Sequence, residues 1–384
     1  MNILFDFITP QHFVGGAGEY TRKVFFSLFE RIKENQCQIK VLGLYDSGLN
    51  NSPYPDLSPE NLRLFGVEPI DVKGKGLKEV VSSNCIDKIF IGAGQYWTKY
   101  DLSDIPCPIV CVIHDLCDEE YYENRLIDLE KSTELLPYIF YRLRRRFRKP
   151  RRLLADRTLI DAVSQHTDSR LITVSEFSRL CLHYHFNLEE DKVIVLYSPE
   201  RISQKKDTIE NDILRSVIKD KKKYFLLLSA DRKKKNAKSA LRAFRRYVEN
   251  CGDDAWIVTV GAKSSQFDRQ IVLPYLCESD LSYAMANCYA LVFPSIFEGF
   301  GYPPVEAMKH GKPILHSNVT SIPEIVGDGQ ISFSPFYSSD IYSAFTVLTD
   351  INYKIYSDNA IIRYQELLTR QKKDLQHLLD LILE

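Results

Sequence analysis

The sequence predicts an α/β protein built from two Rossmann-like domains in succession. Apolar runs of strand length alternate with helical patterns along the chain, which is typical of parallel sheets covered by helices. A polar, charged segment at residues 198–212 interrupts this alternation, which then starts again. A chain of 384 residues is long for one hydrophobic core and natural for two.

The first domain is expected at residues 1–200 and the second at 201–360, with a last helix at about 361–384 that packs back onto the first. Ligands of such sheets bind at the carboxyl ends of the strands, so the cleft between two facing sheets is the expected site. Strands of the first domain are predicted at 3–8, 39–45, 86–91, 109–114, 171–174 and 193–196, with a helix at about 18–32. The second domain is predicted to have strands at 224–228, 256–260, 290–293 and 313–316 and helices at 239–247, 281–287 and 304–310.

The composition excludes several classes of protein. Hydrophobic residues make up 45% and charged residues 26%, as in a folded soluble protein. The formal net charge of -1 argues against a general nucleic-acid binder. Nine cysteines at irregular spacings indicate reduced thiols, with no zinc site and no other metal site expected. No secretion signal and no apolar run of about 18 residues is found, so a cytoplasmic protein is expected.

The most informative stretch is FPSIFEGFGYPPVEAMKHG at residues 293–311. A buried strand leads into a tight loop with Gly299 and Gly301, and a helix follows near two prolines. Such a loop offers backbone N–H groups to an anion and lets a ligand approach the main chain. Glu298 and Glu306 flank the loop, and carboxylates suit the vicinal hydroxyls of ribose or a hexose. The alternative is a helix-capping Glu298 and a solvated Glu306.

This stretch resembles the family 4 retaining glycosyltransferases of the GT-B fold. Their signature, P-S-x-x-E-G-F-G-x-P-x-x-E-A-M, is matched here by Pro294, Ser295, Glu298, Gly299, Phe300, Gly301, Pro303, Glu306, Ala307 and Met308. The resemblance implies that Glu298 contacts the hydroxyls of the donor sugar and that Glu306 holds the ribose hydroxyls. It also implies that the amides of Gly299, Phe300 and Gly301 face the sugar and the diphosphate. The segment 317–329 is family-like too, with a mainly structural role.

A basic loop, SADRKKKN at residues 229–236, follows the predicted strand at 224–228. Lysines at a strand end can neutralise a diphosphate, although a basic run is more often a solvated loop. The family pattern here is G-R-x-x-x-R-K-N, and its lysine corresponds to Lys235. Ala230 occupies the position of the family's arginine, and Arg232 is the candidate replacement. Both Lys235 and Arg232 are expected to bind the donor.

The loop FVGGAGEY at residues 13–20 brings glycines between the first strand and the first helix. Gly15 and Gly16 allow a ligand to approach the backbone, and the resemblance assigns this loop to the donor diphosphate and the acceptor. The dinucleotide pattern G-x-G-x-x-G is not met, because Thr21 occupies its third glycine position. An NAD-dependent oxidoreductase is therefore a weaker alternative.

His114 ends the predicted strand at 109–114 in the sequence IHDL. A lone histidine is more often structural, but one at the carboxyl end of a parallel strand points toward the ligand. IHDL resembles the mannosyltransferase-like members of the family, in which this histidine contacts the donor sugar and assists the reaction. Asp115 is a candidate for orienting its imidazole. Ser175 is predicted to be the N-cap of a helix.

A run of basic residues at 142–152 begins with Arg142 and ends with Arg152. One interpretation is a solvated helix face. The other is peripheral contact with anionic lipids at the inner face of the membrane, or with a phosphorylated lipid acceptor.

The resemblance as a whole implies a retaining hexosyltransferase that needs no cofactor. The catalytic candidates are His114, Glu298 and Lys235, and no D-x-D motif is identified in a cleft position, so metal independence is predicted. IHDL favours GDP-mannose as the donor, and UDP-hexoses and deoxysugar nucleotides stay open. The expected acceptor is a glycan or lipid-linked oligosaccharide of a surface polysaccharide. A non-catalytic nucleotide-sugar-binding subunit is the second alternative.

Overall fold

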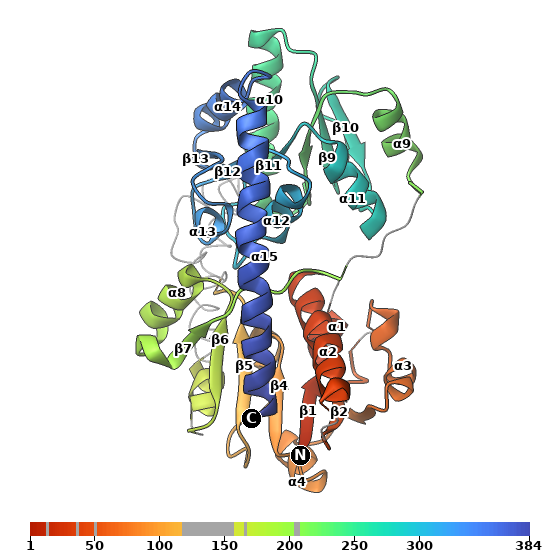
Figure 1. Ribbon diagram of the computed structural model, residues 1–384, viewed down its shortest axis with the longest axis vertical. Helices are drawn as coiled ribbons and strands as arrows, with labels where there is room; N and C mark the ends of the chain where they lie inside the picture. The colour runs from red at the N-terminus through yellow and green to blue at the C-terminus, as the bar shows by residue number, and fades with distance from the viewer. Residues whose placement is uncertain (13–14, 36–37, 50–51, 117–156, 165–166, 203–207) are drawn as a thin grey trace, which may run out of the picture. The chain divides into compact units, whose positions relative to one another are not determined.

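The computed structural model describes all residues except 13–14, 36–37, 50–51, 117–156, 165–166 and 203–207. The chain divides into two compact units (Figure 1). Unit 1 consists of Met1–Ile202 with Arg370–Glu384, and unit 2 consists of Ser203–Thr369. The first division lies close to the predicted boundary at 200, whereas the returning segment starts at Arg370 and not at about 361.

Unit 1 contains a seven-stranded parallel sheet with the strand order β3-β2-β1-β4-β5-β6-β7. The strands are β1 (Asn2–Asp6), β2 (Lys40–Tyr45), β3 (Glu68–Asp71), β4 (Lys88–Ile91), β5 (Ile109–Ile113), β6 (Arg170–Thr173) and β7 (Val193–Val195). The helices are α1 (Ile8–His12), α2 (Gly16–Glu34), α3 (Pro59–Leu64), α4 (Leu77–Ser83) and α8 (Glu176–Phe186), with short 3₁₀ turns η1 (Pro55–Leu57), η2 (Gly94–Tyr96) and η3 (Glu190–Lys192).

Unit 2 contains a six-stranded parallel sheet with the strand order β10-β9-β8-β11-β12-β13. Both sheets therefore have the doubly wound arrangement that the alternating pattern predicts. The strands are β8 (Tyr224–Leu227), β9 (Trp256–Val260), β10 (Gln270–Leu273), β11 (Ala290–Phe293), β12 (Ile314–Ser317) and β13 (Ile331–Phe333). The helices are α9 (Asp212–Lys219), α10 (Ala237–Cys251), α11 (Glu278–Asn287), α12 (Tyr302–Lys309), α13 (Ile322–Val326), α14 (Ser338–Val347) and α15 (Tyr353–Leu383), with the 3₁₀ turn η4 (Lys233–Lys235).

The first strand is shorter than predicted. It was expected at 3–8, but β1 ends at Asp6 and Ile8 already belongs to α1. The reason is the Asp6 side chain, whose Oδ1 accepts hydrogen bonds from the amides of Ile8 and Thr9 and so starts a helix. The next helix begins at Gly16, earlier than the predicted Gly18, with Gly15 as its N-cap.

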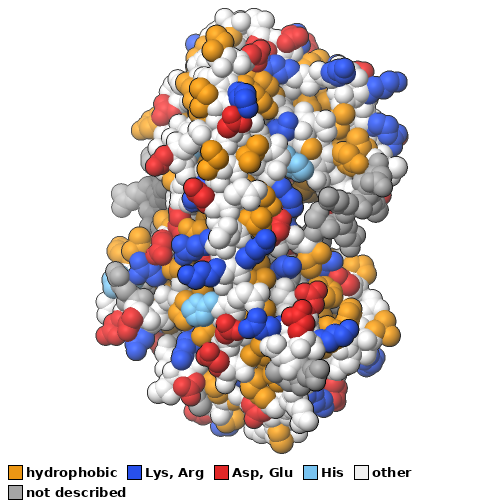
Figure 2. All heavy atoms as spheres, viewed as in Figure 1, with side chains coloured by type: hydrophobic (Ala, Val, Ile, Leu, Met, Phe, Trp, Pro, Cys, Tyr) orange, Lys and Arg blue, Asp and Glu red, His pale blue; other side chains and the backbone are white. Residues whose placement is uncertain are grey.

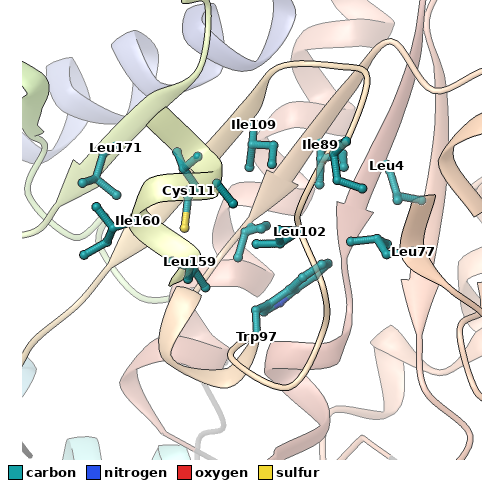
Figure 3. Packing of buried hydrophobic residues seen from close by; sticks show 14 of the residues in the cluster. Leu4, Leu77, Ile89, Trp97, Leu102, Ile109, Cys111, Leu159, Ile160 and Leu171 are labelled. Atoms are coloured by element: carbon teal, nitrogen blue, oxygen red, sulfur yellow. The ribbon is translucent and has the colours of Figure 1, made fainter. Parts of the chain in front are cut away.

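Each unit has its own hydrophobic core. In unit 1 the fully buried Trp97 packs with side chains from β1, β4 and β5, such as Leu4, Ile89 and Ile109 (Figure 3). In unit 2 the core is aromatic, and the rings of Phe225 and Phe345 meet edge to face at 5.0 Å. Two separate cores of this size explain why one chain supports two units.

The long helix α15 contributes to both units. Near its start, Arg363 donates hydrogen bonds to the carbonyls of Glu324 and Ile325, so this part stays with unit 2. Near its end, Asp374 accepts from the amide of Tyr197, and Lys88 Nζ donates to the carbonyl of Leu381. These bonds explain why the returning segment of unit 1 starts later than predicted.

The visible surface carries charges of both signs. Figure 2 shows Lys and Arg side chains interspersed with Asp and Glu, in keeping with the formal net charge of -1. Among the described residues, no helix combines the length and the apolar composition needed to cross a bilayer. The predicted membrane-contact run, from Arg142 to Arg152, lies outside the described residues.

A buried histidine gives unit 2 a predicted pH dependence. His316 in β12 is 2% exposed, and burial lowers its pKa to about 4. Below pH about 6.5 the unfolded chain therefore binds a proton at His316, whereas the folded chain does not bind it until the pH is near 4. The contribution of this site to the unfolding free energy is thus complete above pH about 6.5 and declines as the pH falls toward 4. We expect this site to remove about 2 kcal/mol of unfolding free energy between pH 7 and pH 5.

The measurement compares urea unfolding of the native protein and of His316→Leu at both pH values. Other histidines titrate equally in both proteins, so the difference between the two pH dependences isolates His316. An identical loss of stability in the variant would contradict this assignment.

Candidate donor-binding site

The glycine turn of the sequence motif lies at the carboxyl end of β11. Gly301 has φ 99°, a left-handed conformation that favours glycine, and it is the N-cap of α12. The turn is held from the segment before α13, where Thr320 Oγ1 accepts from the amide of Glu298 and Ser321 Oγ donates to its carbonyl. The alternative interpretation of Glu298 as a helix cap is wrong, because the α12 cap has no side-chain hydrogen bond.

Two prolines change which amides α12 can offer to an anion. Pro303 and Pro304 occupy its first turn and have no N–H group. The remaining donors at this helix end are the amides of Gly301 and Tyr302, together with those of the preceding turn. Negative charge on a ligand would therefore be met by the turn 299–302 more than by the body of the helix.

Lys235 and Glu298 come together although they are far apart in the sequence. Lys235 Nζ lies 2.5 Å from Glu298 Oε1, and the two side chains are only 11% and 13% exposed. Lys235 is the last residue of η4, and its ammonium also lies 5.1 Å from the centroid of the Phe293 ring. A second link fixes this loop to the turn, since the amide of Ile296 donates to the carbonyl of Lys234. A cation is thus fixed beside the glycine turn.

The other predicted donor residues of unit 2 occupy the same edge of the sheet with different exposure. Gly299 and Phe300 are buried in the turn, and the Phe300 ring packs against Tyr302 at 5.6 Å. Glu306 is half-buried on α12. Arg232 is exposed at the N-cap of η4 and lies near Tyr275, where its charge lowers the phenol's pKa against the larger effect of burial. Binding of the donor by Arg232 stays a prediction.

The glycines of unit 1 are supported by a tyrosine that the sequence analysis missed. Gly15 lies between β1 and α2, and its amide donates to the hydroxyl of Tyr54. A Cβ on Gly18 would come within 2.8 Å of the same ring, so Tyr54 packs directly against this loop. Burial raises the pKa of Tyr54 to about 12, so its hydroxyl stays protonated. Gly16 begins α2 and lies in the same turn.

His114 follows β5 at the carboxyl edge of the first sheet. It is 8% exposed, and its Nε2 lies 2.9 Å from the carbonyl oxygen of Gly92. Burial lowers the pKa of His114, with the Gly92 bond opposing this effect, so the imidazole is neutral near pH 7. Asp115 stays a candidate for orienting the ring, since its charge opposes the lowering of the His114 pKa, and the hydrogen bond at Nε2 is made with Gly92. Ser175 is an N-cap as predicted, since its Oγ accepts from the amide of Ser178.

No cluster of three metal-ligating side chains occurs in the part of the chain that the structure describes. Unit 2 brings together a cation, a carboxylate and a glycine turn. These groups can bind an anion and sugar hydroxyls by charge and hydrogen bonds. Unit 1 has a neutral histidine at the carboxyl edge of its own sheet.

Comparison with known proteins agrees with this chemistry. Residues 208–341, which contain Lys235 and the glycine turn, match the family described as Glycosyl transferases group 1. The chain as a whole has the GT-B fold. The Anabaena protein Alr3699/HepE, whose crystal structure contains UDP-glucose, aligns over 98% of this chain and 99% of its own with a TM-score of 0.63 at 16% identity.

Several of the relatives with similar sequences are mannosyltransferases. The serotype-specific mannosyltransferase WbdA of Escherichia coli is 26% identical over 366 residues, which cover 82% of this chain and 41% of WbdA. The O-antigen chain mannosyltransferase RfbU of Salmonella typhimurium is 26% identical over 43% of this chain and 46% of its own. The chain thus spans about two fifths of the length of WbdA. The predicted resemblance to family 4 glycosyltransferases, and to their mannosyltransferase-like members, is confirmed.

Proposed function

We propose that this chain is a retaining mannosyltransferase that takes mannose from GDP-mannose and adds it to a glycan or lipid-linked acceptor in surface polysaccharide synthesis. The observation that carries the proposal is the Lys235–Glu298 pair beside the glycine turn of β11. The names of WbdA and RfbU as mannosyltransferases support mannose, and RfbU, an O-antigen chain mannosyltransferase, supports the O-antigen class of acceptor. UDP-glucose in HepE supports a nucleotide sugar as the donor class.

In the proposed reaction, the bond between the anomeric carbon and the diphosphate breaks. Lys235 and the amides of the turn 299–302 stabilise the negative charge that develops on the leaving GDP. The acceptor oxygen forms the new bond on the same face, and the departing phosphate oxygen takes its proton. Glu298 would hold the hydroxyls of the donor sugar, and the neutral His114 would contribute hydrogen bonds that carry no charge.

The proposed step needs no protein nucleophile and no metal ion. Lys235 supplies positive charge where a metal-dependent enzyme would place a cation. The proposed compartment is the cytoplasm, which suits the free thiols of the described cysteines. Contact of residues 142–152 with the membrane remains a prediction.

The first test is thermal stabilisation by a panel of GDP, UDP, dTDP, NAD and their sugar derivatives. We expect GDP and GDP-mannose to raise the melting temperature most, because ligands that bind only the folded state stabilise it. Stabilisation by NAD alone would indicate an oxidoreductase. Stabilisation by GDP-mannose without hydrolysis or transfer would indicate a non-catalytic subunit.

The second test follows transfer from GDP-mannose to a synthetic lipid-linked acceptor by mass spectrometry, with and without EDTA. We expect an α-linked product, detected by NMR, at equal rates in both samples. A β-linked product would contradict retention, and loss of activity in EDTA that Mg²⁺ restores would contradict metal independence.

A further inference from the structure

Hydrogen bonds connect the ends of three neighbouring strands of unit 1 at the carboxyl edge of the sheet. β1 pairs with β4, and β4 pairs with β5. Asp6 is the last residue of β1, Gly92 follows β4, and His114 follows β5. The amide of Gly92 donates to Asp6 Oδ2 at 2.9 Å, and the carbonyl of the same glycine lies 2.9 Å from His114 Nε2.

The hydrogen bond to Gly92 determines which ring nitrogen of His114 carries the proton. A carbonyl oxygen only accepts hydrogen bonds, so Nε2 must carry the proton that it donates to Gly92. In a neutral imidazole the other nitrogen, Nδ1, is then an acceptor. Among the described residues, Nδ1 has no hydrogen-bond partner. Its lone pair is therefore available to a hydroxyl of a ligand.

The glycine in the middle cannot shift. A Cβ on Gly92 would come within 2.1 Å of Thr21 Oγ1 and 2.9 Å of its Cγ2. Thr21 is itself held, since its hydroxyl donates to the carbonyl of Ala17. The Cα of Gly92 is thus packed tightly against Thr21 of α2, and Asp6 holds the amide of the same residue.

The Asp6 side chain is also fixed by hydrogen bonds. Asp6 is completely buried, and its carboxylate accepts hydrogen bonds from the amides of Ile8 and Thr9 and from Thr9 Oγ1, besides that of Gly92. Burial raises the pKa of Asp6, and the Thr9 and Gly92 donors oppose this effect. A carboxylate with amide donors on both oxygens suits the ionised form.

Other contacts hold the ring of His114 and the backbone around it. The Tyr20 ring meets it edge to face, with centroids 4.8 Å apart and planes at 90°. Ser178 Oγ donates to the backbone carbonyl of His114, and Thr173 Oγ1 donates to that of Ile113. The tautomer is the remaining freedom of this side chain, and Gly92 decides it.

We propose that Asp6 is a positioning residue of the transferase, which fixes the backbone of Gly92 and so holds His114 as the Nε2–H tautomer with Nδ1 turned to the donor sugar as an acceptor. The proposal rests on the proposed function for its catalytic consequence. The tautomer itself is a property of the unliganded protein.

The decisive variant is Asp6→Asn. Its amide oxygen can keep the Ile8 and Thr9 amide bonds, and its NH₂ group can face Thr9 Oγ1, which is able to accept. The NH₂ group cannot accept from the Gly92 amide, so two donors face each other at this point. The substitution therefore disturbs the link to Gly92 while it preserves the start of α1.

The readout is long-range ¹H–¹⁵N NMR of the protein labelled at histidine, with His114 assigned by comparison with His114→Gln. We expect native His114 to be the Nε2–H tautomer and Asp6→Asn to show a mixture of tautomers. We expect kcat for mannose transfer to fall about ten- to a hundredfold, the range for residues that orient a functional imidazole, with KM for the donor changed less than kcat.

The matched control is Thr9→Val, which removes one hydrogen bond to the same carboxylate but leaves the Gly92 link. We expect its tautomer to be native and its kcat to stay within about twofold. A native His114 in the Nδ1–H form, or an unchanged tautomer in Asp6→Asn, would overturn the proposal. The tautomer of native His114 is read without any activity measurement, so a failure of the proposed function would appear separately, as absence of mannose transfer.

Discussion

Lys235→Met is expected to reduce kcat/KM for mannose transfer by about two to three orders of magnitude, the usual effect of removing a group that stabilises developing negative charge. The reason is that Lys235 is the cation fixed next to the glycine turn, with its Nζ 2.5 Å from Glu298. Methionine keeps the aliphatic stem of the side chain, and with it much of the packing against Phe293. The measurement is the rate of transfer from GDP-mannose, with the affinity for GDP measured by calorimetry.

Lys233→Met is the matched control. Lys233 belongs to the same 3₁₀ turn, has the same charge and is exposed. We expect this variant to retain activity within about twofold, because an exposed charge is screened by solvent. Equal losses in both variants would show that the general charge of the loop matters and not the placed ammonium of Lys235.

The Lys235 substitution also leaves Glu298 without its partner. An unpaired carboxylate that is only 13% exposed lowers the stability of the protein. A loss of folded protein would then add to the loss of transfer activity. Lys235→Met combined with Glu298→Gln removes the unpaired charge. We expect the double variant to regain thermal stability but not activity. Recovery of activity in the double variant would contradict the proposed role of both residues.

Gly92→Ala is expected to lower the unfolding free energy of unit 1 by about 3 kcal/mol or more, at the upper end of what overpacking costs. The added Cβ would lie 2.1 Å from Thr21 Oγ1. Neither group can move easily, because the Gly92 amide is hydrogen-bonded to Asp6 and the Thr21 hydroxyl to the carbonyl of Ala17. Urea unfolding measures the loss, followed by tryptophan fluorescence in a Trp256→Phe background so that only Trp97, which is buried in unit 1, reports.

Two further variants decide whether this clash is the cause. Gly92→Ala with Thr21→Ala removes the two nearest atoms and leaves the closest contact at 3.0 Å, so we expect most of the stability to return. Gly76→Ala is the control for a glycine in open space, since no atom lies within 4 Å of its Cβ position, and we expect a change within about 1 kcal/mol. A stable Gly92→Ala variant would refute the tight packing.

The central strands and their helices were predictable because their apolar runs are continuous. The strands that the sequence analysis missed are β3, β10 and β13, and each lies at an edge of its sheet. Edge strands are covered less completely, so their sequences are short and mixed, as in Glu68–Asp71. The continuous apolar run that indicates a central parallel strand is absent from Glu68–Asp71.

The site shows the same division. Lys235 and Glu298 were found because each lies within a contiguous motif that follows a strand. Asp6 was correctly placed in the first strand, but its role in starting α1 was missed, although Asp is a preferred residue just before a helix. Tyr54 and Gly92 have no local signal, since their partners lie in other elements.

The sequence by itself determined the alternation of strands and helices, the two sheets, and the glycine turn with its acidic neighbours, because periodicity and turn chemistry act over a few residues. Only the tertiary structure decided that Lys235 meets Glu298 and that Asp6 reaches His114 through Gly92. These contacts join separate strand ends, and which ends become neighbours depends on the order of strands in the folded sheet.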